Sequence, residues 1–148
     1  MTRTDDNLAR FIAGYCEAMI WANTTVTVDG EPDDEQTGDL YPSAFQTPRD
    51  GWQLEAFDLD AQESIESDCR DFLGANMRDV VEYVRRLGDS YGPWEAAGHD
   101  FALTRNGHGA GFRDRGLGEV GERLTANAKP YGESSGYLDE NESEIHLD

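Results

Sequence analysis

The sequence is short of lysine and of positive charge in general. Lys129 is the single lysine among 12 basic residues, which face 31 acidic ones, so the formal net charge is −19. Such a surface repels bare nucleic acid and anionic membranes, and we expect neither to be a direct partner. Lysine scarcity combined with acidity is typical of proteins from a high-salt cytoplasm, while arginine in place of lysine is equally typical of a GC-rich genome.

Cysteine and long apolar runs are also scarce. Cys16 and Cys69 are the two cysteines, and both fall inside apolar helical patterns, which predicts free buried thiols. No apolar run approaches the roughly 18 residues of a membrane span, and the first ten residues lack the layout of a signal peptide. We therefore expect a soluble protein of the cytoplasm. No ligand pattern predicts a metal, and no motif predicts a cofactor.

The apolar content is sufficient for one domain with a core. Apolar residues make up 37% of the 148 residues and aromatic residues 10%, which is more than a disordered acidic chain carries. We predict a single globular domain over 1–138, with an exposed acidic loop at 29–39 and a mobile acidic tail at 139–148. The loop holds six carboxylates but lacks the spacing of a calcium-binding EF-hand, so we interpret it as solvated.

Apolar residues recur at helical spacing in four segments. The predicted helices cover 5–22, 60–73, 77–87 and 117–128, and short strands are predicted at 24–28 and 136–138. Asp60 and Glu63 have the spacing of a capping box at the start of the second helix. Gly88 stands where a C-terminal glycine cap is expected for the third.

One segment differs from the rest of the chain in charge and composition. Residues 99–115, HDFALTRNGHGAGFRDR, carry a net charge of +1, whereas residues 1–98 carry −14 and residues 116–148 carry −6. Asn106-Gly107 is a strong hairpin signal, because a type I′ turn needs positive φ at both central residues. We therefore predict a β-hairpin over 99–113 whose register places Phe101 opposite Phe112.

The same register collects polar side chains on one face of the predicted hairpin. His99 falls opposite Asp114, and Arg105 opposite His108. An imidazole beside a carboxylate suits general base catalysis, so the candidate catalytic residues are His99, His108 and Asp114. A guanidinium beside an imidazole suits an anion or a partner surface. The candidate binding residues are Arg105, Asn106, Gly107, His108 and Arg113.

Other chemistries are less well supported at this segment. His99 and His108 would lie at opposite ends of the hairpin, so they do not predict a metal site. The glycines resemble a phosphate-binding loop, but the surrounding motif is absent. No serine or cysteine stands in a catalytic constellation, so the sequence does not support an enzyme. The structural alternative is a hairpin that packs on the helices with its charges in surface ion pairs.

Residues 98–118, GHDFALTRNGHGAGFRDRGLG, resemble a group of small proteins encoded by bacteriophages and other mobile elements. The stretch that the group shares reads close to GHDFWLTRNGHGAGFWDRGLG. A looser similarity covers FIAGYCEAMIWAN, SDCRDFLGAN and RLTANAKPYGE. This chain has Ala102 and Arg113 where the group carries tryptophan. The resemblance implies a genetic context and no particular activity.

Together these observations predict an α+β fold in which three or four helices pack on one face of a small antiparallel sheet centred on the 99–113 hairpin. The leading hypothesis for function is an accessory protein of a phage or mobile element that binds a host or phage macromolecule, most simply a protein, through the 99–115 surface. A counter-defence role is compatible with that context. The alternatives are a small enzyme or nucleotide- or anion-binding protein that uses His99, Arg105, His108 and Asp114, and an acidic DNA mimic that occupies a DNA-binding protein.

Overall fold

The computed structural model describes residues 3–22, 24–28, 31–37, 53–88, 92–107, 111–139 and 145–147. Its helices are α1 (Arg3–Ala22), α2 (Leu59–Leu87), α3 (Pro93–Arg105) and α4 (Glu119–Ala128), with short 3₁₀ helices η2 (Gln53–Ala56), η3 (Phe112–Arg115) and η4 (Lys129–Tyr131). Its strands are β1 (Thr24–Val28), β2 (Glu31–Thr37), β3 (Gly136–Asp139) and β4 (His146–Leu147). None of the described helices is both long and apolar enough to cross a membrane.

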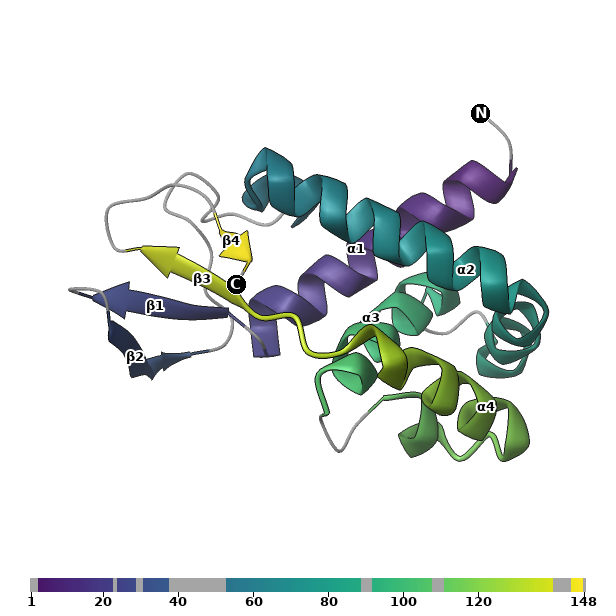
Figure 1. Ribbon diagram of the computed structural model, residues 1–148. Helices are drawn as coiled ribbons and strands as arrows, with labels where there is room; N and C mark the ends of the chain where they lie inside the picture. Colours follow the sequence, from purple (N-terminus) through teal and green to yellow (C-terminus); the bar gives the residue numbers. More distant parts are fainter. Residues whose placement is uncertain are drawn as a thin grey trace.

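The strands form one mixed sheet with the order β2-β1-β3-β4. β1 pairs antiparallel with β2 and parallel with β3, and β3 pairs antiparallel with β4. Figure 1 shows this sheet beyond the C-terminal end of α1, on the opposite side of the molecule from α4. The combination of helices with a small sheet agrees with the predicted α+β class. The sheet is neither wholly antiparallel nor centred on 99–113.

The predicted hairpin at 99–113 is wrong, because residues 93–105 form α3 and residues 112–115 form η3. Asn106 caps the C-terminus of α3, and Gly107 follows it with φ +76°. Positive φ at this glycine fits the end of a helix as well as it fits a hairpin turn. Asn106-Gly107 therefore indicates a turn with positive φ at the glycine, but it does not decide whether a strand or a helix precedes that turn.

Two predicted irregular segments also contain strands. Residues 31–37, inside the predicted acidic loop, form β2. Residues 145–147 of the predicted mobile tail belong to the domain, because Ile145 is fully buried and His146–Leu147 pairs with β3. His146 Nδ1 lies against the carboxylate of Asp58 at the start of α2. His146 therefore packs on the domain, although it lies within the predicted mobile tail.

The long helix α2 joins the second and third predicted helices into one. Asn76 interrupts it with non-helical angles, φ −124° and ψ 19°, and its side chain donates to the carbonyl of Phe72 at 3.0 Å. The break predicted at 74–76 is therefore a kink. The N-cap is Asp58, whose Oδ1 accepts from the backbone N–H of Ala61 at 2.7 Å, and not Asp60. The glycine cap at Gly88 is confirmed, with φ +75°.

The core lies where α1, α2 and α3 meet. Phe72 of α2 stacks on Phe101 of α3 with ring centroids 4.2 Å apart. Cys16 and Cys69 are buried, free thiols, as predicted. α1 and α3 pack closely because each presents a glycine to the other's backbone: a Cβ on Gly14 would lie 1.8 Å from the Glu95 carbonyl oxygen, and a Cβ on Gly98 would lie 1.8 Å from the Phe11 carbonyl oxygen.

Candidate functional site

The 98–118 motif occupies the second half of α3, the following turn and η3, and its central aspartate is buried. Asp100 is 2% exposed. Arg115 on η3 donates to both of its carboxylate oxygens, from Nε at 3.0 Å and from Nη2 at 3.2 Å. The hydroxyl of Tyr83 on α2 donates to the same carboxylate. This ion pair holds η3 against the side of α3. It also provides the buried Asp100 carboxylate with an opposite charge and with hydrogen-bond donors.

Arg105, a predicted binding residue, is also buried. Its guanidinium donates to Asp68 Oδ2 at 2.7 Å and to the Tyr15 hydroxyl at 3.1 Å. Further N–H groups donate to the backbone carbonyls of Tyr131 and Gly132, both at 2.9 Å. Arg105 thus connects α1, α2 and η4 to the end of α3. Its side chain is 5% exposed and does not form part of a contact surface.

The turn after α3 is held by further residues of the motif. Thr104 Oγ1 accepts from the backbone N–H of Phe112 at 3.2 Å, and it lies so close to Gly111 that a Cβ there would be 2.3 Å away. The side chain of Asn106 donates to the carbonyl of Ala102 at 2.8 Å and accepts from the N–H of Ser134 at 2.6 Å. The end of α3 and the start of η3 are therefore both anchored.

The predicted catalytic residues do not assemble as the hairpin register required. His99 is half-buried and lines a hollow of about 200 Å³ with Gly14, Glu17, Glu95, Ala96 and Arg115. Burial lowers the pKa of His99, with Asp100 and Glu17 opposing this shift. Asp114 is exposed on η3 and does not line this hollow. His108 lies outside the described residues, and no metal-ligand cluster occurs among those that are described.

Ala102 and Arg113, the two positions at which the group resembled by the motif carries tryptophan, differ in burial. Ala102 is 2% exposed, inside the core, whereas Arg113 is exposed and forms an ion pair with Glu122 of α4 at 3.1 Å. The side chains at these two positions therefore do not form one common surface. Of the predicted binding residues, Gly107 and Arg113 are exposed and Asn106 is half-buried.

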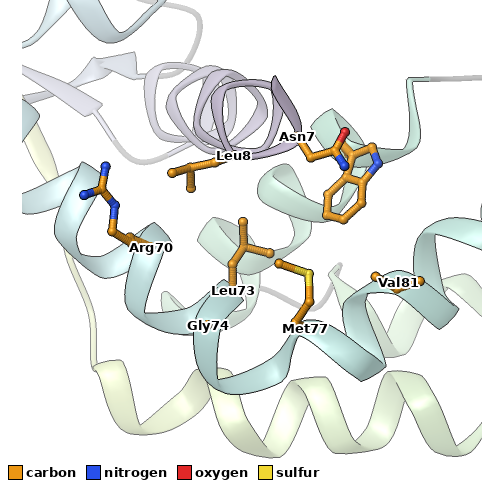
Figure 2. Close-up of a pocket in the computed structure, with 8 residues that line it drawn as sticks. Asn7, Leu8, Arg70, Leu73, Gly74, Met77 and Val81 are labelled. Atoms are coloured by element: carbon orange, nitrogen blue, oxygen red, sulfur yellow. The ribbon is translucent and has the colours of Figure 1, made fainter. Parts of the chain in front are cut away.

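A second concave feature, which the sequence did not reveal, is an apolar groove of about 410 Å³ between α1, α2 and the start of α3. Its lining residues are Asn7, Leu8, Arg70, Leu73, Gly74, Met77, Val81 and Trp94. In Figure 2, Leu8 of α1 points toward Leu73 and Met77 of α2, with Arg70 at one end and Val81 at the other. The sequence places Met77 and Val81 in the predicted helix 77–87 and Gly74 in the gap before it, so their spacing alone did not indicate a groove.

Searches with the whole chain found no match among protein-family models, curated proteins or solved structures.

Proposed function

We propose that the protein is an accessory protein of a phage or other mobile element that binds a protein partner through the exposed part of residues 99–115. The observation that carries this proposal is the manner in which η3 is held on α3. Arg115 of η3 forms an ion pair with Asp100 of α3, and Thr104 of α3 accepts from the backbone N–H of Phe112 at the start of η3. The exposed Arg113 and Asp114 are thereby presented on a fixed backbone.

The glycines of this segment support the same proposal. Gly107, Gly111, Gly116 and Gly118 all have positive φ, a region that other residues rarely adopt. At Gly111, Gly116 and Gly118, which flank η3, the described backbone is therefore one that other residue types would not readily follow. A loop that is ordered before it meets a partner loses less conformational entropy on binding, and loops on rigid scaffolds commonly carry binding residues.

The size of the hollow at His99 favours a macromolecular partner over a nucleotide. Its volume is about 200 Å³. Pockets that bury a small ligand or cofactor measure roughly 300–1,000 Å³. Glu17 and Glu95 also line the hollow and would repel phosphate groups.

The test is site-specific photocrosslinking in lysate from phage-infected and uninfected host cells. A photoreactive amino acid replaces Arg113 in one variant and Ala126, an exposed residue of α4, in the control. We expect one discrete adduct from position 113 that is absent from position 126, and we expect it to be lost when Asp114→Arg is added to the crosslinking variant. Equal adducts from both positions, or none from position 113, would contradict the proposal.

A further inference from the structure

The apolar groove between α1, α2 and the start of α3 continues along α2. Met77 and Val81 line this groove, and both also line a second hollow of about 660 Å³ between α2 and α4. The other residues that line the second hollow are Arg78, Asp79, Glu82, Arg85 and Arg123. We call the apolar groove and this hollow together the α2 groove. From Arg70 to Arg85 the α2 groove follows about 22 Å of helix, at about 1.5 Å per residue.

The middle of the α2 groove is apolar and accessible. Four side chains form most of its lining: Leu8, Leu73, Met77 and Trp94. Gly74, which is exposed, lies at its centre, and a Cβ on Gly74 would meet nothing within 4 Å. Glycine in a helix interior is less stable than alanine. The approach of another backbone from outside the chain at Gly74 would offset that loss of stability.

Positive charge lies at the Val81 end of the α2 groove. Arg78 and Arg85 are exposed there, and neither forms an ion pair within the described residues, although carboxylates outnumber basic residues 31 to 12. The two carboxylates of this end, Asp79 and Glu82, are both engaged by Arg123 of α4, at 3.0 and 3.5 Å. Among the described residues, this end therefore presents two guanidinium groups that no carboxylate of the chain neutralises.

The opposite end of the α2 groove has mixed charge. Arg70 lines it, and the same arginine lines a neighbouring hollow of about 420 Å³. The other residues that line the neighbouring hollow are Glu63, Glu66, Ser67 and Asp71. Three carboxylates accompany one arginine there, so this end does not attract an anion. The α2 groove thus runs from a mixed end through an apolar middle to a basic end.

We propose that the α2 groove binds an amphipathic helix of a protein partner, antiparallel to α2. The apolar side of this helix lies against Leu73 and Met77, and its acidic first turns face the two arginines of the basic end. Apolar side chains at helical spacing are the anchors in helix-in-groove recognition. Carboxylates in the first turn of a helix also interact favourably with its dipole, which makes such a partner segment stable as a helix. This site goes beyond the proposed surface at 99–115 and does not depend on it.

The exposure of the α2 groove favours a helix over a small amphiphilic molecule. Several of its lining residues are exposed: Arg70, Gly74, Arg78 and Arg85. Sites for small ligands bury most of the ligand surface, whereas a docked helix buries its apolar side and leaves its polar side in water. The net charge of −19 favours a basic partner at long range. The Debye length is only about 8 Å at physiological ionic strength, so the charges that face each other decide the interaction.

The test measures the binding of two synthetic helical peptides of about 15 residues to the full chain by fluorescence anisotropy. Both peptides carry leucine at helical spacing; one has glutamate in its first two turns, and the other has lysine at the same positions. We expect the glutamate peptide to bind with a dissociation constant between about 1 µM and about 1 mM, and the lysine peptide to bind at least about tenfold more weakly. The net charge of −19 alone would produce the opposite order. Equal affinities, the opposite order, or no binding of the glutamate peptide up to about 1 mM would overturn the proposal.

Variants of the α2 groove then locate the bound peptide. Gly74→Leu fills the open space at the centre and should abolish binding, while its midpoint of urea unfolding stays near that of the parent protein. Arg78→Glu should weaken binding of the glutamate peptide at least about tenfold, an effect of about 1.4 kcal/mol, and should strengthen binding of the lysine peptide. Lys129→Glu, the matched charge reversal on exposed η4, should leave both affinities unchanged.

Binding that survives Gly74→Leu, or that responds equally to Arg78→Glu and Lys129→Glu, contradicts the proposed site. Neither peptide requires the surface at 99–115, so a negative result here leaves the crosslinking result at position 113 unaffected.

Discussion

Replacing Arg115 by glutamine removes the positive member of the ion pair beneath the motif. Asp100 then remains inside α3 at 2% exposure, with the Tyr83 hydroxyl as its remaining side-chain hydrogen-bond partner in the part of the chain that the structure describes. Removing one member of a fully buried pair costs about 3–5 kcal/mol, because the other charge stays desolvated. The Arg115 side chain is 34% exposed, so water reaches part of the site and lowers this cost. We expect Arg115→Gln to reduce the free energy of unfolding by about 2–3 kcal/mol.

Two further variants separate the ion pair from its surroundings. Asp100→Asn removes the buried charge and leaves Arg115 able to turn to solvent, so its cost should be smaller, about 1–2 kcal/mol. The double variant contains no buried charge and should be no less stable than Arg115→Gln alone. This non-additivity is the signature of direct coupling between the two side chains.

The assay is urea unfolding followed by far-UV circular dichroism at neutral pH. Arg113→Gln is the matched control, because its ion pair with Glu122 is about 59% and 58% exposed and should contribute less than about 1 kcal/mol. A loss of stability below about 0.5 kcal/mol for Arg115→Gln, within the range of ordinary surface substitutions, would refute the reasoning. So would equal losses for the Arg113 and Arg115 variants.

Three other predictions concern glycine packing, histidine titration and thiol reactivity. Gly98→Ala should prevent stable folding, because its Cβ would overlap a backbone carbonyl of α1. Gly74→Ala should instead stabilise the protein by about 0.5–1 kcal/mol, because the space beside Gly74 is open. Thermal unfolding of the two variants compares them. Burial lowers the pKa of His99 in the folded protein below its ordinary 6.5. The unfolded state therefore binds more protons at His99, and the free energy of unfolding falls as the pH falls through about 6.5. Between pH 7.5 and pH 5.5, about one unit either side of the ordinary histidine pKa, His99→Gln should therefore lose less stability than the parent protein. An equal loss in both proteins would contradict this. Cys16 and Cys69 should resist alkylation in the native protein and react after unfolding in urea, because burial raises the pKa of both thiols.

The sequence predicted the elements that have one exposed and one buried side. α1, both halves of α2, and α4 are amphipathic, and their apolar spacing was sufficient to find them. β1 followed from its β-branched residues, and β3 was found within one residue. Two helical patterns that belong to one helix were predicted as two helices, because the backbone is non-helical at Asn76, whose side chain donates to the carbonyl of Phe72.

The sequence did not predict the helix α3, because this helix has no exposed polar side and its polar residues therefore do not recur at helical spacing. All but one of residues 96–105 are buried, including charged Asp100 and Arg105, so apolar and polar residues do not alternate at helical spacing. Pro93 at its first turn was the available start signal. Small residues carry the rest of the information: Gly98 brings α3 against α1, and its partner glycine lies more than 80 residues earlier in the sequence. Such a long-range contact leaves no local pattern.

The burial of the motif changes how its residues are to be interpreted. Asp100, Thr104 and Arg105 hold other parts of the chain, and each would be constrained by folding even if the protein had no partner at all. A charged residue in a distinctive motif is therefore weak evidence for a binding role until its own partners are known. Arg113 and Asp114 differ from them, because both are exposed on η3 and the ion pair of Arg113 with Glu122 is itself exposed. Substitutions at Arg113 and Asp114 should alter recognition with little effect on stability, whereas those at Asp100 and Arg105 should alter both, and this division separates the two kinds of residue within one motif.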